Sequence, residues 1–114
     1  GAAEEQRVIE DESRRLAEKI PLSPQTQVIA LDIRGKALSS EDLAGRIGDW
    51  TLSGKSELVF LIGGSLGLSR ELLGKADFRL SFSPMTFPHQ LMRVLLLEQV
   101  YRAFKIRHNQ PYHK

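Results

Sequence analysis

The sequence lacks cysteine, so neither a disulfide nor a thiolate metal site can hold this chain of 114 residues together. It also lacks any apolar run near the roughly 20 residues that span a bilayer, and its first residues, GAAEEQR, are unlike a signal peptide. We therefore expect a cytoplasmic protein with no membrane partner. With 41% hydrophobic and 26% charged residues, the composition is that of one globular domain with a single modest core.

Charge is unevenly distributed along the chain, although the net charge is only +2. Residues 1–20 carry six acidic and four basic residues, whereas residues 89–114 carry five basic residues and a single acid, Glu98. All three histidines lie in this second stretch. A basic carboxyl-terminal end indicates a phosphate-bearing partner. A solvated tail that happens to be basic is the competing interpretation, and charge taken alone favours it.

Hydrophobic spacing predicts an alternation of helices and strands. Helices are expected over residues 4–20, from Ser39 or Ser40, from Ser69, and from Pro88 to before Pro111. Short buried strands are expected over residues 27–33, 57–62 and 78–83, the first closed by a turn at Arg34-Gly35. This order is typical of an α/β fold, in which helices flank a mostly parallel sheet.

The last helix is unusually apolar. Its large apolar residues include Leu91, Val94, Leu97, Tyr101 and Phe104, and the full set covers far more than the stripe of roughly 100° that a surface helix needs. We therefore expect this helix to be buried on two sides, by its own sheet and by a second subunit.

One loop follows each predicted strand: Arg34-Gly35, residues 63–67 and residues 83–88. Ligands of open parallel sheets bind outside the carboxyl ends of the strands, so these loops mark the candidate site. In the last loop, Pro84 and Pro88 each fix a φ angle and remove a backbone donor. This loop is expected to be rigid, with its carbonyls and hydroxyls free to face a ligand.

The turn at residues 63–67 reads Gly-Gly-Ser-Leu-Gly. It is not the Gly-x-Gly-x-x-Gly of dinucleotide-binding proteins, and it lacks the Lys-Ser/Thr ending of a phosphate loop. Two interpretations stay open. The glycines either form a tight turn that needs positive φ, or they leave the backbone bare so that a flat ligand can approach it.

Other chemistry finds little support in the sequence. There is no Gly-x-Ser-x-Gly segment and no acid spaced to orient a histidine, which argues against nucleophilic hydrolysis. His108 and His113 have no carboxylate between them, so no metal site is expected. His89 is either a phosphate donor or a solvated residue of the first helical turn. Glu98 and Arg102 have the spacing of a surface ion pair, or else Arg102 points into a site with its charge oriented by Glu98.

Several residues, taken in combination, resemble a known family: VFLIGG at 59–64, LS at 80–81, TFPH at 86–89, Arg93, Glu98, YRA at 101–103 and PYHK at 111–114. Together they resemble the ribosomal large-subunit methyltransferase H family, SPOUT-class enzymes that methylate N3 of a pseudouridine in helix 69 of 23S rRNA. The resemblance covers about residues 10–114. Members of that family begin with a strand, a helix and another strand that this chain does not show. We therefore expect residues 1–114 to form a single SPOUT methyltransferase domain that is incomplete at its amino-terminal end.

The resemblance implies an α/β domain with a carboxyl-terminal trefoil knot, an obligate homodimer, 23S rRNA within the ribosome as partner, and S-adenosylmethionine as cofactor, with no metal. Carried over position by position, the cofactor contacts fall at Leu31, Gly64, Ser83, Pro84, Met85, Thr86, Phe87 and Pro88. These residues lie at the same strand ends that the sheet geometry selects.

The implied reaction assigns roles to residues near the carboxyl-terminal end. N3 of a uracil ring is mostly protonated at neutral pH, so a cation must stabilise its anion and a neutral imidazole is suited to take the proton. We predict Arg102 as the electrostatic stabiliser, His113 as base or substrate positioner, and Tyr112 as the residue that stacks on or orients a base. In a dimer, the tail of one subunit completes the site of the other. The expected RNA-binding residues are His89, Arg93, Lys105, Arg107 and Lys114.

Two other functions stay open at this point. One is a non-catalytic RNA-binding or ribosome-associated module that has a SPOUT-like fold but has lost the reaction. The other is an unrelated nucleotide-binding α/β domain. A thermal shift with S-adenosylmethionine, compared with ATP or NAD, distinguishes them, because a ligand that binds only the folded state raises the melting temperature.

Overall fold

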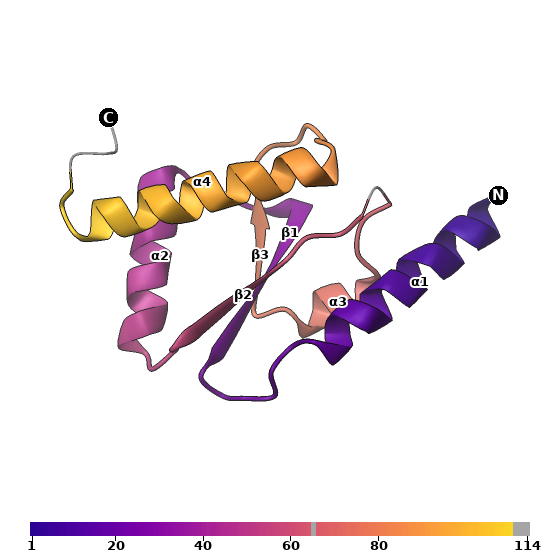
Figure 1. Cartoon of the computed structure of the whole chain (residues 1–114), viewed down its shortest axis with the longest axis horizontal. Helices are drawn as coiled ribbons and strands as arrows, with labels where there is room; N and C mark the ends of the chain where they lie inside the picture. Colours follow the sequence, from indigo (N-terminus) through magenta and orange to yellow (C-terminus); the bar gives the residue numbers. More distant parts are fainter. Residues whose placement is uncertain (65, 111–114) are drawn as a thin grey trace.

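The computed structural model describes residues 1–64 and 66–110, in which helices and strands alternate along the chain (Figure 1). The elements are α1 (Ala2–Glu18), β1 (Thr26–Ala37), α2 (Ser40–Leu52), β2 (Glu57–Leu61), α3 (Arg70–Lys75), β3 (Phe78–Ser81) and α4 (His89–Arg107). The predicted order of elements is confirmed.

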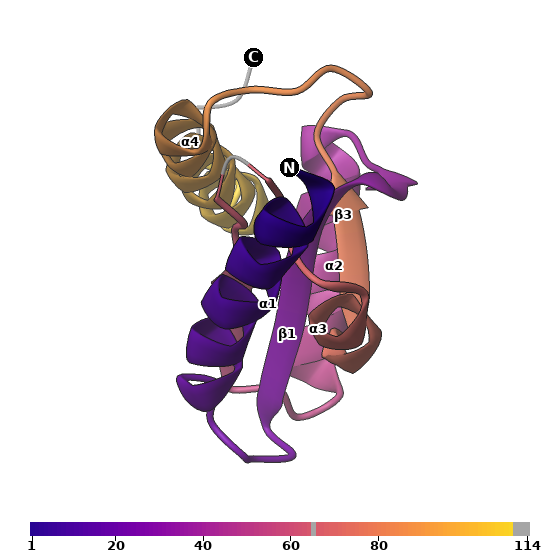
Figure 2. The ribbon, with the colours of Figure 1, turned by 90° about the vertical axis from the view of Figure 1, so that its right-hand side faces the viewer.

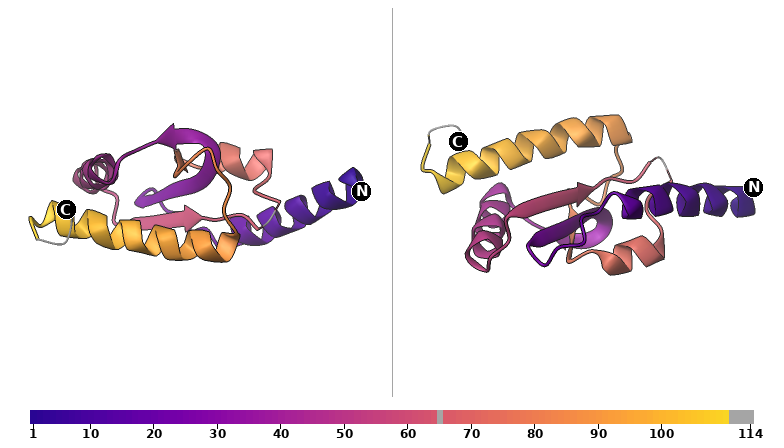
Figure 3. Two further views of the ribbon diagram at one scale, coloured as in Figure 1. Left: turned by 90° about the horizontal axis from the view of Figure 1, so that it is seen from above. Right: turned by 60° about the horizontal axis from the view of Figure 1, so that its bottom comes forward.

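The strands form one parallel sheet in the order β2-β1-β3. Helices cover both of its faces. Successive residues of β1 point to opposite sides of the sheet, so its apolar side chains are buried against helices on each side. On one face Ile29 packs with buried residues of α2 and α4, and on the other Val28 and Ala30 pack with Leu72 of α3 and with residues of α1. Figure 3 shows α4 and α3 on opposite sides of the strands. The predicted α/β fold with a parallel sheet is confirmed.

Two serines begin helices as the sequence predicts. The Ser39 hydroxyl accepts a hydrogen bond from the Asp42 N–H at 3.0 Å, and the Asp42 carboxylate accepts one from the Ser39 N–H at 3.4 Å. This reciprocal arrangement is a capping box, and it selects Ser39 over Ser40 as the cap of α2. At α3, the Ser69 hydroxyl accepts a hydrogen bond from the Leu72 N–H at 3.1 Å.

β1 is longer than predicted. Instead of ending at Ile33, the strand runs on to Ala37 through a bulge, so that Leu31 and Lys36 both lie opposite Leu80 of β3. Gly35 permits this arrangement, because a Cβ at that position would lie 2.6 Å from the backbone carbonyl of Arg79. The Arg34-Gly35 turn therefore lies inside the strand as a bulge and does not close it.

The other two strands are slightly shorter than predicted. β2 ends at Leu61 and β3 at Ser81. The residues that follow enter loops at the carboxyl edge of the sheet, and Pro84 has no backbone N–H with which to continue strand pairing. The trefoil knot stays a prediction.

α4 presents one buried and one exposed apolar face. Leu96 and Ala103 are 6% and 0% exposed, and Ala103 packs with buried residues of α2 and the sheet. An outer stripe on α4, which consists of Val94, Leu97, Tyr101 and Phe104, is 41–69% exposed. The expected burial by the protein's own sheet is confirmed. The outer stripe stays largely exposed to solvent, with the Lys105 and Arg107 side chains over its two aromatic rings.

Candidate functional site

A cavity of about 910 Å³ opens at the carboxyl ends of the strands. Its walls come from the bulge of β1, from the turn between β2 and α3, and from the loop between β3 and α4, which arches over this end of the sheet in Figure 2. The three loops selected by the sheet geometry thus meet around one space. The volume lies within the range of roughly 300–1,000 Å³ that is usual for small-molecule sites.

Five of the eight predicted cofactor residues line this cavity: Leu31, Ser83, Met85, Thr86 and Phe87. Gly64, Pro84 and Pro88 do not line it. The neighbouring Gly63 and Gly67 do, together with Phe82 and Met92. Sequence reasoning missed Phe82 and Met92. Phe82 directly follows β3, and Met92 begins the second turn of α4. Both could have been predicted as site residues from their positions on either side of the predicted loop.

The glycine turn after β2 is closed on its own backbone. The Gly67 N–H donates to the Gly64 carbonyl at 3.0 Å, and Gly67 has a φ of 89°. A Cβ on Gly63 would lie 2.6 Å from the Gly67 carbonyl carbon. The interpretation as a tight turn is therefore confirmed at Gly67, where positive φ favours glycine.

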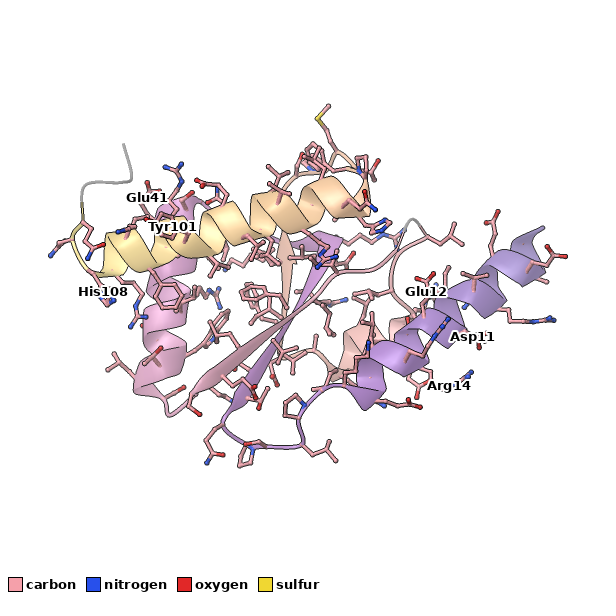
Figure 4. All side chains as sticks on the ribbon, in the orientation of Figure 1. Asp11, Glu12, Arg14, Glu41, Tyr101 and His108 are labelled. Atoms are coloured by element: carbon pink, nitrogen blue, oxygen red, sulfur yellow. The ribbon has the colours of Figure 1, made fainter. Side chains whose placement is uncertain are left out.

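Gly64 faces α1. A Cβ at this position would lie 2.6 Å from a carboxylate oxygen of Glu12, which is labelled on α1 in Figure 4. The neighbouring Ser13 is buried, and its hydroxyl accepts a hydrogen bond from the Ser69 N–H at 2.8 Å. These contacts hold α1 against the glycine turn and the first turn of α3.

The loop between β3 and α4 combines exposed apolar side chains with available backbone donors. Met85 and Phe87 are 70% and 36% exposed. The Ser83 hydroxyl accepts a hydrogen bond from the Met85 N–H at 3.0 Å, which fixes the start of the loop. Among the described residues, the N–H groups of Thr86 and Phe87 meet no acceptor. The loop can therefore pack on a flat apolar ring and donate hydrogen bonds to its polar edge.

Charged side chains also line the cavity. They are Asp32, Arg34, Arg70 and Arg79. The sequence analysis named Arg34 only as part of the loop after the first strand, and it selected neither Asp32, Arg70 nor Arg79. Arg34 immediately follows the expected first strand and Arg70 follows the Ser69 cap, so both could have been found from their positions at the carboxyl edge of the sheet.

Arg102 and Glu98 form a close ion pair on α4. The distance from Arg102 Nη2 to Glu98 Oε1 is 2.6 Å, and Arg102 Nε donates to the same oxygen at 3.0 Å. Both side chains are partly exposed, at 25% and 35%, so the pair contributes at most about 1 kcal/mol to folding. Arg102 does not line the cavity of its own chain. Its role in catalysis stays a prediction.

The predicted RNA-binding residues on α4 fall into two groups. His89 and Arg93 are exposed in the first two turns, and Lys105 and Arg107 lie in the last turns. The rise of an α-helix separates the two groups by about 20 Å or more. At the far end, Lys105 Nζ lies 5.2 Å from the centre of the Tyr101 ring, and Arg107 stacks similarly on Phe104. Such cation–aromatic pairs are suited to phosphates and bases. Tyr112, His113 and Lys114 lie outside the described residues.

The described residues contain no group of three or more His, Asp and Glu side chains that could hold a metal ion. No helix among them is both long enough and apolar enough to cross a bilayer.

The parallel sheet, with one cavity at the carboxyl ends of its strands, places the chain among α/β domains that bind small molecules at that edge. The comparisons define the class more narrowly. The chain belongs to the SPOUT methyltransferase family, since the family model described as "Predicted SPOUT methyltransferase" matches residues 1–113.

Curated relatives cover nearly the whole chain. The ribosomal RNA large subunit methyltransferase H of Carboxydothermus hydrogenoformans is 58% identical over 98% of this chain and 69% of its own length. Proteins of the same name from Desulforamulus reducens and Clostridioides difficile are 56% and 54% identical over 96% and 99% of this chain, and over 68% and 70% of their own lengths.

A SPOUT methyltransferase requires a methyl donor, and the residues that line the cavity fit S-adenosylmethionine. Leu31, Met85 and Phe87 offer apolar contact to an adenine ring. The N–H groups of Thr86 and Phe87 are available to hydrogen-bond its edge. Gly63 and Gly67 give the glycine turn a wall without side chains.

Proposed function

We propose that this chain is an S-adenosylmethionine-dependent methyltransferase of the cytoplasm that methylates N3 of a pseudouridine in helix 69 of 23S rRNA on the ribosome. One observation carries the proposal: all three strand-end loops line one cavity, in a chain whose relatives are named for methylation of large-subunit rRNA. The resemblance of the sequence to that family supports the specific nucleotide.

The cofactor is held by residues at the three strand ends. The adenine ring packs against Leu31 and the apolar side chains of the loop between β3 and α4, and backbone groups of that loop read its edge. The residues proposed to contact the cofactor inside the cavity are Leu31, Ser83, Met85, Thr86 and Phe87. Gly64, Pro84 and Pro88, which the resemblance adds to this set, lie next to lining residues along the chain and are proposed to contribute through their backbone. When bound, the cofactor supplies a methyl group activated by a sulfonium.

The remaining chemistry falls to residues of the carboxyl-terminal end. Arg102 stabilises the charge that develops on the uracil ring when N3 loses its proton. His113 takes that proton or positions the ring, and Tyr112 stacks on or orients a base. Methyl transfer needs an in-line nucleophile and little else, so positioning supplies most of the rate.

A homodimer completes this site. The outer stripe on α4 recurs at spacings of three and four residues, which is the pattern of a helix seam that packs on another helix. Since Arg102 does not line the cavity of its own chain, we infer that α4 and the tail of one subunit reach the cavity of the other. RNA backbone then lies along the basic residues His89, Arg93, Lys105, Arg107 and Lys114.

Mass mapping of 23S rRNA tests the proposal directly. Ribosomes from cells without the protein are incubated with the purified protein and S-adenosylmethionine, and the modified nucleotide is located by mass spectrometry. The expected result is one added methyl group on one pseudouridine. A 23S rRNA that stays unmodified would overturn the proposal.

A thermal shift separates the enzyme from a non-catalytic RNA-binding module. At a concentration one hundred times its dissociation constant, S-adenosylmethionine stabilises the folded state by about 2.7 kcal/mol. A domain of this size should then melt several degrees higher. RNA binding with no shift in the melting temperature would favour the non-catalytic module.

A further inference from the structure

Three arginines from three separate elements converge on the cavity: Arg34 from the bulge of β1, Arg70 from the first turn of α3, and Arg79 from β3. All three are exposed. Within the part of the chain that the structure describes, none of their guanidinium groups forms a hydrogen bond or an ion pair. We call these three residues the arginine rim.

The backbone brings two members of the arginine rim together. The bulge lies directly on β3. Only glycine fits at position 35, because a Cβ there would lie 2.6 Å from the Arg79 carbonyl. This close approach brings the bulge that carries Arg34 against the strand that carries Arg79, and Lys36 of the same segment lies opposite Leu80. Cations gathered around one cavity raise its positive potential, which attracts anions.

The cofactor alone does not account for this much positive charge. Asp32 is the only acidic residue that lines the cavity among the described residues. S-adenosylmethionine carries two positive groups, its sulfonium and its ammonium, and a single carboxylate. One carboxylate engages one guanidinium in a bidentate pair. The remaining cations of the arginine rim are therefore available to bind a second anion, one with several charged groups.

We propose that the arginine rim binds the phosphate backbone of the substrate RNA where the RNA crosses the mouth of the cofactor cavity. This inference rests on the proposed function and adds a binding surface separate from the basic residues of α4. Arginine is suited to the role because its planar guanidinium donates two parallel hydrogen bonds to a phosphate. The rim positions the RNA and does not read its bases.

The test compares two triple variants with equal loss of charge. The rim variant carries Arg34→Gln, Arg70→Gln and Arg79→Gln. The control carries Arg7→Gln, Arg15→Gln and Lys19→Gln, three exposed substitutions on and just after α1 that do not line the cavity. Binding of a helix 69 RNA hairpin is measured over a range of salt concentrations, and S-adenosylmethionine binding is measured by calorimetry.

We expect the rim variant to bind the hairpin about tenfold or more weakly, with a salt dependence shallower by about one unit for each phosphate that the variant no longer binds. The control should keep nearly the RNA affinity and the S-adenosylmethionine affinity of the wild type. The rim variant should lose at most the one pair between a guanidinium and the cofactor carboxylate, so its S-adenosylmethionine affinity should fall by less than its RNA affinity. A second rim variant with lysine at the same three positions should recover most of the RNA affinity, because it keeps the charge.

Equal RNA affinity of the rim variant and the control would overturn the inference while leaving the proposed function intact. Loss of cofactor affinity with unchanged RNA binding would also overturn it, since the arginines would then serve the cofactor. If the wild-type protein neither binds the hairpin nor methylates 23S rRNA, the proposed function fails and the inference fails with it.

Discussion

At the turn after β2, two neighbouring glycines meet different surroundings. A Cβ on Gly63 would approach the Gly67 backbone at 2.6–2.9 Å, whereas a Cβ on Gly64 would meet the far end of the Glu12 side chain. A backbone wall cannot yield, but a flexible carboxylate can rotate away. We expect Gly63→Ala to lower the free energy of unfolding by about 1–3 kcal/mol and Gly64→Ala to change it by less than about 1 kcal/mol.

Urea denaturation of both variants measures this difference. Gly64→Ala is the matched control, since it makes the same substitution one residue further along the same turn. Equal losses of stability in the two variants would show that the turn does not close on its own backbone as described.

Arg102 gives a second prediction at the scale of single residues. Arg102→Ala should abolish methyl transfer, a loss of at least about 10²–10³ in rate, because it removes the cation that stabilises the developing charge. It should leave S-adenosylmethionine affinity nearly unchanged, because Arg102 does not line the cavity of its own chain. Single-turnover kinetics and calorimetry measure the two effects separately. A variant that loses cofactor binding would show that the assignment of Arg102 is wrong.

Some contacts of single residues could be predicted from the sequence and others could not. The caps at Ser39 and Ser69 could be predicted, because a cap bonds to a residue only three positions away. The approach of Glu12 to Gly64 could not, because it joins two segments that meet only after the chain has folded. The convergence of Arg34, Arg70 and Arg79 on one cavity could not be predicted for the same reason.

The docking of α1 supplies a prediction at the scale of elements. The buried Ser13 hydroxyl accepts the hydrogen bond of the Ser69 N–H at the start of α3. Ser13→Ala leaves that buried donor without a partner, which should cost about 1–3 kcal/mol of stability. The melting temperature should therefore fall by roughly 4–8 °C for each kcal/mol.

Ser56→Ala is the matched control, since Ser56 is exposed and its side chain makes no hydrogen bond among the described residues. Its free energy of unfolding should differ from that of the wild type by no more than about 0.5 kcal/mol, so its melting temperature should hardly change. If both variants have the same melting temperature, the Ser13 hydrogen bond does not hold α1 in place.

Elements were predicted better than their ends. Short buried apolar runs, helical spacing and helix caps identified all seven elements, because each of these signals is local to its own segment. The course of β1 past Ile33 was predicted wrongly. Its continuation depends on Gly35 lying against Arg79 of β3, a meeting of distant segments that no local pattern contains.

At the scale of the whole molecule, the outer stripe on α4 predicts self-association. Leu97 is 69% exposed at the middle of the stripe. Leu97→Glu should turn the dimer into a monomer, because a dimer would have to bury its carboxylate in an apolar interface. Light scattering should then report the mass of one chain, where the wild type gives twice that mass.

Leu52→Glu is the control, since Leu52 is 88% exposed at the end of α2, away from the outer stripe. It should remain a dimer. A wild-type protein that is monomeric, or a Leu97→Glu protein that is still dimeric, would contradict the assignment of this surface.

The central claim is that the three strand-end loops hold the methyl donor between them, and a crystal structure with bound S-adenosylmethionine tests it most directly. The account predicts the adenosyl group in the cavity at the carboxyl ends of the strands, in contact with Leu31 and with the loop between β3 and α4. A cofactor bound elsewhere, or a cavity filled by the protein's own side chains, would contradict the claim.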